Sequence, residues 1–231
     1  MSATTPAGVL LIAVPIAFNV AFGTLAARFD YPDVLRRPTR EVLAAFAADG
    51  TGLVLTWLAF ALTALAMVPL VVLLSGALAG ADPTLLALTT TTGVLAAAVQ
   101  FLGLVRWPFL VPYLAREHGD PAASEARREA IDVVFQAFNR YLGVAVGEHL
   151  GYALTGTWTV LAGVAVTQSD AAPGVFGVLG IVIGPVLASC SLEFVGAHEP
   201  RGWRLAERLT PPAYVAWSLW LAATGVALLA T

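Results

Sequence analysis

Six long apolar stretches, separated by polar segments rich in arginine or in turn-forming residues, dominate this sequence. A helix needs about 20 mostly apolar residues to cross a bilayer, and each stretch meets that length. We therefore predict an all-α, polytopic transmembrane bundle that forms a single domain over residues 1–231. The predicted spans cover residues 7–26, 51–78, 84–114, 140–167, 173–195 and 211–230.

The composition excludes several classes of protein. Only 12% of the residues are charged and 58% are hydrophobic, whereas soluble domains carry roughly 25% charged residues. The net charge of −3 leaves no basic surface for phosphates, so no nucleic-acid partner is expected. Because Cys190 is the single cysteine, an intrachain disulfide is excluded, and neither a metal site nor a cofactor is predicted.

The arginines predict the orientation of the bundle. Eleven of the twelve lie in the loops that follow the first, third and fifth spans, and the chain has no lysine. By the positive-inside rule these loops are cytoplasmic, so both termini are expected outside a cell membrane. Residues 1–8 carry no arginine, so the first span is expected to remain as a membrane helix. The loop arginines are Arg28, Arg36, Arg37, Arg40, Arg116, Arg127, Arg128, Arg140, Arg201, Arg204 and Arg208.

Two cytoplasmic segments are predicted to be amphipathic helices, a longer one over residues 122–138 and a shorter one near residues 39–48. The longer helix would lie on the inner leaflet or continue directly into the fourth span. Docking of a protein partner is the alternative for it. Near the start of the sixth span, aromatic residues are interpreted mainly as an interfacial belt. They are Trp203, Tyr214, Trp217 and Trp220.

Glycines spaced for close helix packing mark the fourth and fifth spans. The fourth contains Gly143, Gly147 and Gly151, and the fifth contains Gly177, Gly180 and Gly184. We expect both spans to be core helices. The spacing leaves open whether each close partner is a helix of the same chain or of another protein, including a second copy.

Ionisable and polar residues inside the spans are the candidates for function, because a charge at the bilayer centre costs at least about 2.5–3.5 kcal/mol. Counting from the nearest loop arginines places Asn19, Arg106, Glu148 and Glu193 at a similar depth in the cytoplasmic half of the membrane. Glu148 and Tyr152 are four residues apart and share a helix face. The full set of candidate ligand-binding residues is Arg106, Glu148, Tyr152, His149, Asn19, Gln100, Trp107 and Glu193.

Three interpretations of Arg106 and Glu148 stay open. The two side chains could form a structural ion pair that fixes helix register. Arg106 could instead extend toward the interface. In the third interpretation both residues line a functional pocket, where Pro108 leaves the carbonyl of Leu104 without its helical donor. His149 is interpreted as a hydrogen-bonded core histidine in preference to a ligand-binding one.

Residues 100–159 resemble a family of bacterial multi-pass membrane proteins described only as a domain of unknown function. The resemblance is carried by an Arg-Trp pair and a Gly-Glu-x-Leu-Gly-Tyr run. It implies about six spans in a bacterial cell membrane and implies no activity. The matching residues here are Arg106, Trp107, Gly147, Glu148, Leu150, Gly151 and Tyr152.

Three functions follow as expectations. The first is binding or transport of a small polar or anionic molecule or a lipid, with Arg106 holding the head group and Glu148 and Tyr152 as partners. The second is an intramembrane enzyme acting on a lipophilic substrate, with Glu148 as acid or base and His149 assisting. The third is a membrane scaffold or sensor subunit in which the Arg106–Glu148 pair is purely structural.

Overall fold

The computed structural model describes residues 3–230, and within this range the chain is helical with no β-strand, which confirms the predicted all-α class. The elements are α1 (Thr4–Phe29), η1 (Asp33–Arg36), α2 (Thr39–Ala77), α3 (Pro83–Phe109), α4 (Val111–His118), α5 (Glu125–Phe138), η2 (Asn139–Leu150), α6 (Gly151–Gln168), α7 (Gly174–Cys190), η3 (Gly196–His198) and α8 (Arg204–Ala230). Five of the six predicted spans lie in long helical segments, and the remaining one corresponds to the shorter apolar helix α7.

Five helical segments are long and apolar enough to cross a membrane: Thr4–Phe29, Thr39–Ala77, Pro83–His118, Glu125–Gln168 and Arg204–Ala230. The fifth predicted span corresponds to α7, an apolar helix of 17 residues. Its predicted end at residue 195 is wrong, because residues 191–195 form a series of turns after Cys190.

The helix that contains the last predicted span begins before that span. We expected the span to begin at residue 211, and α8 begins at Arg204 and includes both Pro211 and Pro212. Pro211 and Pro212 lie about two turns inside α8, where each leaves the carbonyl four residues earlier without its helical donor. The helix starts before the prolines.

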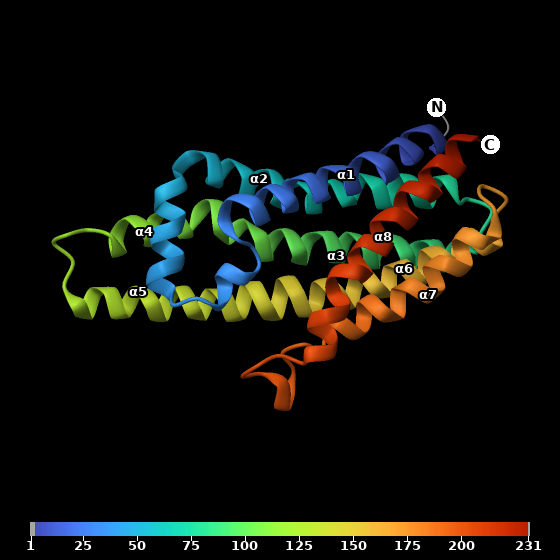
Figure 1. Cartoon of the computed structure of the whole chain (residues 1–231). Coiled ribbons are helices and arrows are strands. Elements are labelled where there is room, and N and C mark those ends of the chain that lie inside the picture. The colour runs from blue at the N-terminus through green and yellow to red at the C-terminus, as the bar shows by residue number, and fades with distance from the viewer. Residues whose placement is uncertain (1–2, 231) are drawn as a thin grey trace.

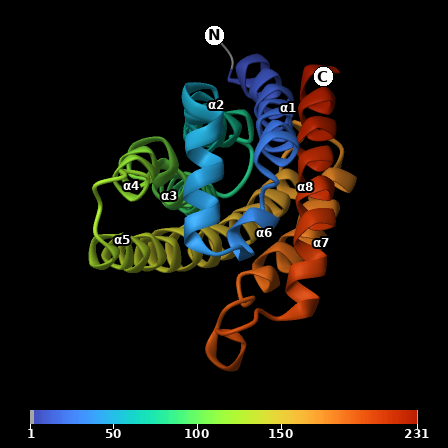
Figure 2. The same ribbon diagram turned by 60° about the vertical axis from the view of Figure 1, so that its left-hand side comes forward.

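The long helices place the two chain ends together (Figure 1). The short connections after α2 and after α6 lie at this same end, and the arginine-bearing connections lie at the opposite end. At the arginine-rich end, the segment between α7 and α8 projects away from the other helices (Figure 2). The structure thus gathers the loop arginines at one end of the bundle, as their alternation along the chain predicts.

A bend at Gly50 divides α2 into two parts. Gly50 has φ 64° and ψ −144°, a conformation that a residue with a Cβ rarely adopts. Residues 39–49 therefore form a separate helix that crosses the direction of the long helices (Figure 1), as the short amphipathic helix predicted there. The hydroxyl of Thr39 accepts a hydrogen bond of 2.9 Å from Gln136 of α5, which fastens this helix to the bundle.

Helices α5, η2 and α6 form one continuous helical rod from Glu125 to Gln168 (Figure 1). Of the two placements expected for the longer amphipathic helix, the structure shows the one that continues into the fourth span. Its free end packs on α4, where Arg127 forms an ion pair with Glu117 and His118 lies 3.5 Å from Asp132. The rod thus extends the bundle beyond the apolar spans.

The glycines of both predicted series contact helices of the same chain. Along η2 and the start of α6, the glycines face α3: a Cβ on Gly147 would lie 3.1 Å from Cα of Gly103, and one on Gly151 would lie 2.8 Å from Gln100. On α7, the glycines face α6, and a Cβ on Gly177 would lie 2.6 Å from the carbonyl oxygen of Gly163. Small residues here allow the backbones to touch. Assembly with a second protein stays a prediction.

Candidate functional site

The candidate residues with ionisable side chains lie on three elements near the arginine-rich end. Arg106 belongs to α3, Glu148 and His149 belong to η2, and Glu193 follows the end of α7. The element η2 is a π-helix of 12 residues, and π-helical turns are uncommon and occur often at functional sites. The sequence pattern does not distinguish it from an α-helix, so its π-helical form was not predicted.

Arg106 is built into the contact between α3 and η2. Its guanidinium donates hydrogen bonds to the carbonyl of Gly103 and, over 2.9 Å, to Oδ1 of Asn139. The residue is only 8% exposed, and its Cζ lies 5.4 Å from the ring centroid of Trp107. Gly143 provides the space, because a Cβ there would lie 2.5 Å from Nη2 of Arg106. The guanidinium is thus buried and already donates hydrogen bonds to two acceptors.

Two details differ from the sequence interpretation of Arg106. The acceptor on its own helix is the carbonyl of Gly103 and not that of Leu104. Within residues 3–230, no nitrogen of Arg106 lies within 4.0 Å of a Glu148 oxygen, so the two side chains form no direct ion pair. The carbonyl of Gly103 and the Asn139 amide together replace the carboxylate as its direct partners. Arg106 and Glu148 still interact electrostatically over a longer range.

Glu148 has no hydrogen bond and no ion pair among the described residues, and it is half-buried. Three tyrosines from different elements lie within electrostatic range of its carboxyl group: Tyr31 after α1, Tyr152 on α6 and Tyr214 on α8. The carboxyl group also interacts with Glu193. A carboxylate in such a place is a strong acceptor that the protein itself leaves unpaired.

Aromatic rings form a continuous wall beside Glu148. The centroid of Tyr152 lies 5.3 Å from that of Tyr214, and Tyr214 lies 5.9 Å from Phe18 of α1. Phe18 lies 6.4 Å from Phe22, which lies 5.7 Å from Tyr31. We call these five residues the aromatic wall. The hydroxyl of Tyr214 is buried beside Thr155 without a hydrogen bond of ordinary geometry.

The aromatic wall was mostly missed by sequence reasoning. Only Tyr152 was named as a site residue, because it shares a helix face with Glu148. Tyr214 was assigned to an interfacial belt, together with two tryptophans that lie in the core. Trp217 donates to the hydroxyl of Thr159 over 2.9 Å, and Trp220 donates to a backbone carbonyl over 2.7 Å. The belt interpretation is therefore wrong for Trp217 and Trp220, which are 5% and 3% exposed.

Two other candidates form hydrogen bonds with other elements of the bundle. Nδ1 of His149 donates over 2.8 Å to the carbonyl of Ser191 beyond the end of α7. The amide of Asn19 donates to the hydroxyl of Ser218 over 3.0 Å. Such bonds connect neighbouring helices and leave these side chains little capacity for a ligand.

Gln100 and Trp107 are likewise held by neighbouring side chains. The amide of Gln100 donates over 2.8 Å to the hydroxyl of Thr155. Trp107 stacks on Trp57 with their ring centroids 4.4 Å apart, inside the core at the arginine-rich end. The eight candidates therefore divide into the electrostatic group of Arg106, Glu148, Tyr152 and Glu193, and four residues with structural contacts.

Glu193 lies in a turn outside the helical spans. Burial raises the pKa of its carboxyl group, Glu207 raises it further, and Arg36 lowers it. Arg36 and Glu207 form an ion pair with each other, so Glu193 has no cation to itself. No group of three or more His, Cys, Asp or Glu residues in the described part of the chain lies close enough to hold a metal ion.

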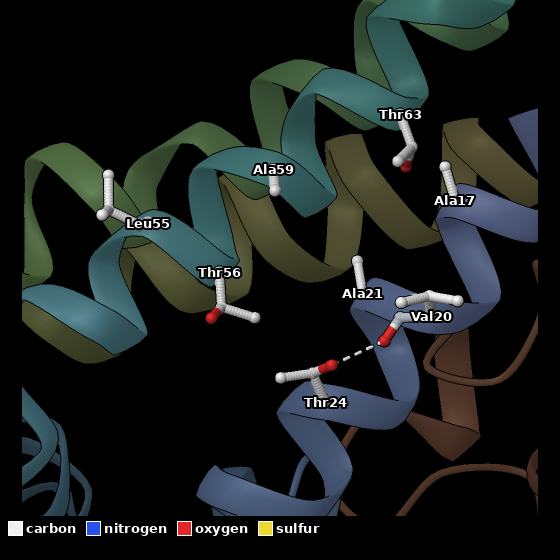
Figure 3. A pocket seen from close by; sticks show the side chains of 8 residues that line it. All are labelled: Ala17, Val20, Ala21, Thr24, Leu55, Thr56, Ala59 and Thr63. Atoms are coloured by element: carbon white, nitrogen blue, oxygen red, sulfur yellow. Dashed lines mark hydrogen bonds between the residues drawn. The ribbon is translucent and has the colours of Figure 1, made fainter.

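A groove lies between α1 and α2 (Figure 3). This groove of about 450 Å³ is lined by Ala17, Val20, Ala21, Thr24, Leu55, Thr56, Ala59 and Thr63. The hydroxyls of Thr24, Thr56 and Thr63 donate to backbone carbonyls of their own helices. The groove therefore offers a mainly apolar surface, and no charged residue lines it.

Comparison with known proteins identifies a family and no activity. Neither a curated protein nor a solved structure matches the chain. Residues 6–225 match the family described as a domain of unknown function, DUF4386. The matched region is nearly the whole chain, and it includes both the Arg-Trp pair and the Gly-Glu-x-Leu-Gly-Tyr run. The chain therefore belongs to the DUF4386 family of uncharacterised proteins.

Proposed function

We propose that this protein binds a small polar molecule, or the polar head of a lipid, at Glu148 within the membrane. One observation carries the proposal: the Glu148 carboxylate is half-buried in a helix of the bundle and has no hydrogen-bond or ion-pair partner among the described residues. Leaving a charged group inside the bilayer without a partner is costly. A bound ligand would supply the missing partner.

A purely structural Arg106–Glu148 ion pair accounts less well for this arrangement than ligand binding does. Arg106 already donates to Gly103 and Asn139, so its burial does not require the Glu148 carboxylate as a direct partner. If Glu148 served only to neutralise Arg106, direct contact would be the more favourable arrangement, because Coulomb energy falls with distance.

An enzyme acting on a lipophilic substrate also has less support. In that alternative His149 assists Glu148, but Nδ1 of His149 is occupied by the carbonyl of Ser191. Glu148 would then have to act as acid or base without a second titratable group in hydrogen-bonding contact.

For the membrane setting, we propose that α7 crosses together with the five longer apolar helical segments. At 1.5 Å per residue, its 17 residues extend about 25 Å, at the short end of the range for a spanning helix. The arginine-rich end would then face the cytoplasm and both termini would face outward across a cell membrane. The Glu148 site would lie in the cytoplasmic half.

Native mass spectrometry of the detergent-purified protein tests the binding proposal. Glu148→Gln is the decisive variant, and Glu129→Gln is the matched control, since Glu129 is an exposed carboxylate on α5. We expect an adduct of defined mass on the wild type and on Glu129→Gln, and none on Glu148→Gln. An adduct that survives in Glu148→Gln, or a folded wild type that carries none, contradicts the proposal.

A further inference from the structure

The geometry points to a ligand class: we propose that the Glu148 site takes a monovalent organic cation, an ammonium group carried on an apolar body. This inference rests on the proposed function and specifies its ligand. It also departs from the sequence expectation of an anionic head group held by Arg106. Three observations support it: the balance of charges around Glu148, the two hydrogen bonds that already occupy Arg106, and the aromatic wall.

When both carboxyl groups are ionised, the charges around the site leave one negative charge unbalanced. Arg106 and Glu193 are charged groups within electrostatic range of Glu148, so one guanidinium then stands against two carboxylates. The neighbouring Arg36 and Glu207 neutralise each other in an ion pair. A single positive charge on the ligand would therefore balance the cluster, whereas an anion would add to the excess.

Arg106 is poorly placed to receive an anion. Both of its terminal nitrogens already donate hydrogen bonds, one to the Gly103 carbonyl and one to Asn139. With the residue 8% exposed and Gly143 against its guanidinium, little of its surface is left for a ligand. Glu148, in contrast, is only partly buried and has no hydrogen-bond or ion-pair partner in the described part of the chain, so the group available to a ligand is an acceptor and not a donor.

The aromatic wall favours an organic cation over a metal ion. Faces of aromatic rings attract ammonium groups, more strongly where water is excluded. Tyr152 follows Glu148 by four residues on the same helical rod, and its ring centroid lies 5.3 Å from that of Tyr214, so rings and carboxylate adjoin the same region. A metal ion would need several oxygen, nitrogen or sulfur ligands, and residues 3–230 contain no such cluster.

Isothermal titration calorimetry in detergent tests the inference with three probes that share a phenyl ring and differ in charge: benzyltrimethylammonium, benzyl alcohol and benzoate. We expect the cation to bind the wild type and the neutral and anionic probes not to bind. Glu148→Gln should weaken cation binding about tenfold or more, because it removes the attracting charge. Glu129→Gln, which changes an exposed carboxylate elsewhere, should leave binding unchanged.

Substitutions in the wall separate ring recognition from the hydroxyl group. Tyr152→Leu should weaken cation binding by about threefold, and more than Tyr152→Phe, which keeps the ring. Thermal unfolding of each variant checks that the bundle remains folded. Equal weakening by both Tyr152 variants contradicts a role for the ring face.

The outcomes also distinguish this inference from the proposed function. Benzoate or benzyl alcohol binding in place of the cation, with loss in Glu148→Gln, overturns the cation class and keeps the binding site. If none of the probes binds, the cation inference fails, while the Glu148-dependent adduct in native mass spectrometry decides the proposed function separately. Cation binding that Glu148→Gln does not affect overturns the inference as well.

Discussion

Replacing Gly103 by alanine should destabilise the bundle through a backbone clash. The new Cβ would lie 2.6 Å from Cα of Gly147 and 3.0 Å from the carbonyl oxygen of Leu142. Carbon atoms normally approach to about 3.5–4.0 Å, so α3 and η2 would have to separate by about 1 Å. Both obstructing atoms belong to the backbone and cannot rotate away.

The size of the destabilisation is worked out by comparing Gly103→Ala with Gly23→Ala. A Cβ on Gly23 meets nothing within 4 Å, so that variant gains only the helix propensity of alanine, up to about 1 kcal/mol. Gly103→Ala gains the same propensity and adds an overpacking cost of about 1–3 kcal/mol. For a chain of this size, the melting temperature of Gly103→Ala should be about 2–12 °C below that of Gly23→Ala.

Thermal unfolding in detergent, followed by tryptophan fluorescence, measures the difference. Gly151→Ala should fall between the two variants, because its Cβ meets the flexible side chain of Gln100 at 2.8 Å. Equal melting temperatures for Gly103→Ala and Gly23→Ala would refute the close crossing of α3 and η2, and with it the placement of Arg106 beside Asn139.

Two further predictions concern the carboxyl group of Glu193 and the orientation of the bundle. Burial raises the pKa of Glu193 above its ordinary value of 4.5, so the folded state binds this proton more tightly and stability falls as the pH rises through the raised pKa. Glu193→Gln removes that loss, and its melting temperature relative to the wild type should increase from pH 4.5 upward; a difference that does not change with pH contradicts the assignment. For topology, a membrane-impermeant maleimide applied to intact cells should label Asp170→Cys and leave Ser124→Cys unlabelled, with buried Cys190 unreactive in both. Labelling of Ser124→Cys alone reverses the proposed orientation.

The helical spans were predictable because hydropathy and length are local properties of the chain. The break before residue 51 was also predictable, since Gly50 separates an amphipathic pattern from an apolar one. The end of α7 and the start of α8 were not. Residues 191–195 are apolar enough to continue a span, and only the turns after Cys190 end it.

The candidate site was predicted in part. Glu148 and Tyr152 share a helix face by their spacing, and the structure places both beside the aromatic wall. The partner of Arg106 was not predictable, because Asn139 lies 33 residues away on another element. Helix spacing predicts which residues of one helix lie together, but it does not define how far that helix is rotated against its neighbours.

The all-α class, the positions of the apolar helices and the grouping of the loop arginines follow from the amino-acid sequence alone, because these depend on composition and periodicity along the chain. Which groups meet depends on how the helices pack: the guanidinium of Arg106 contacts Gly103 and Asn139, and the unpaired carboxyl group of Glu148 lies near tyrosines from three elements. Those contacts depend on glycine-mediated helix crossings, whose depth and rotation result from packing between segments distant in the sequence.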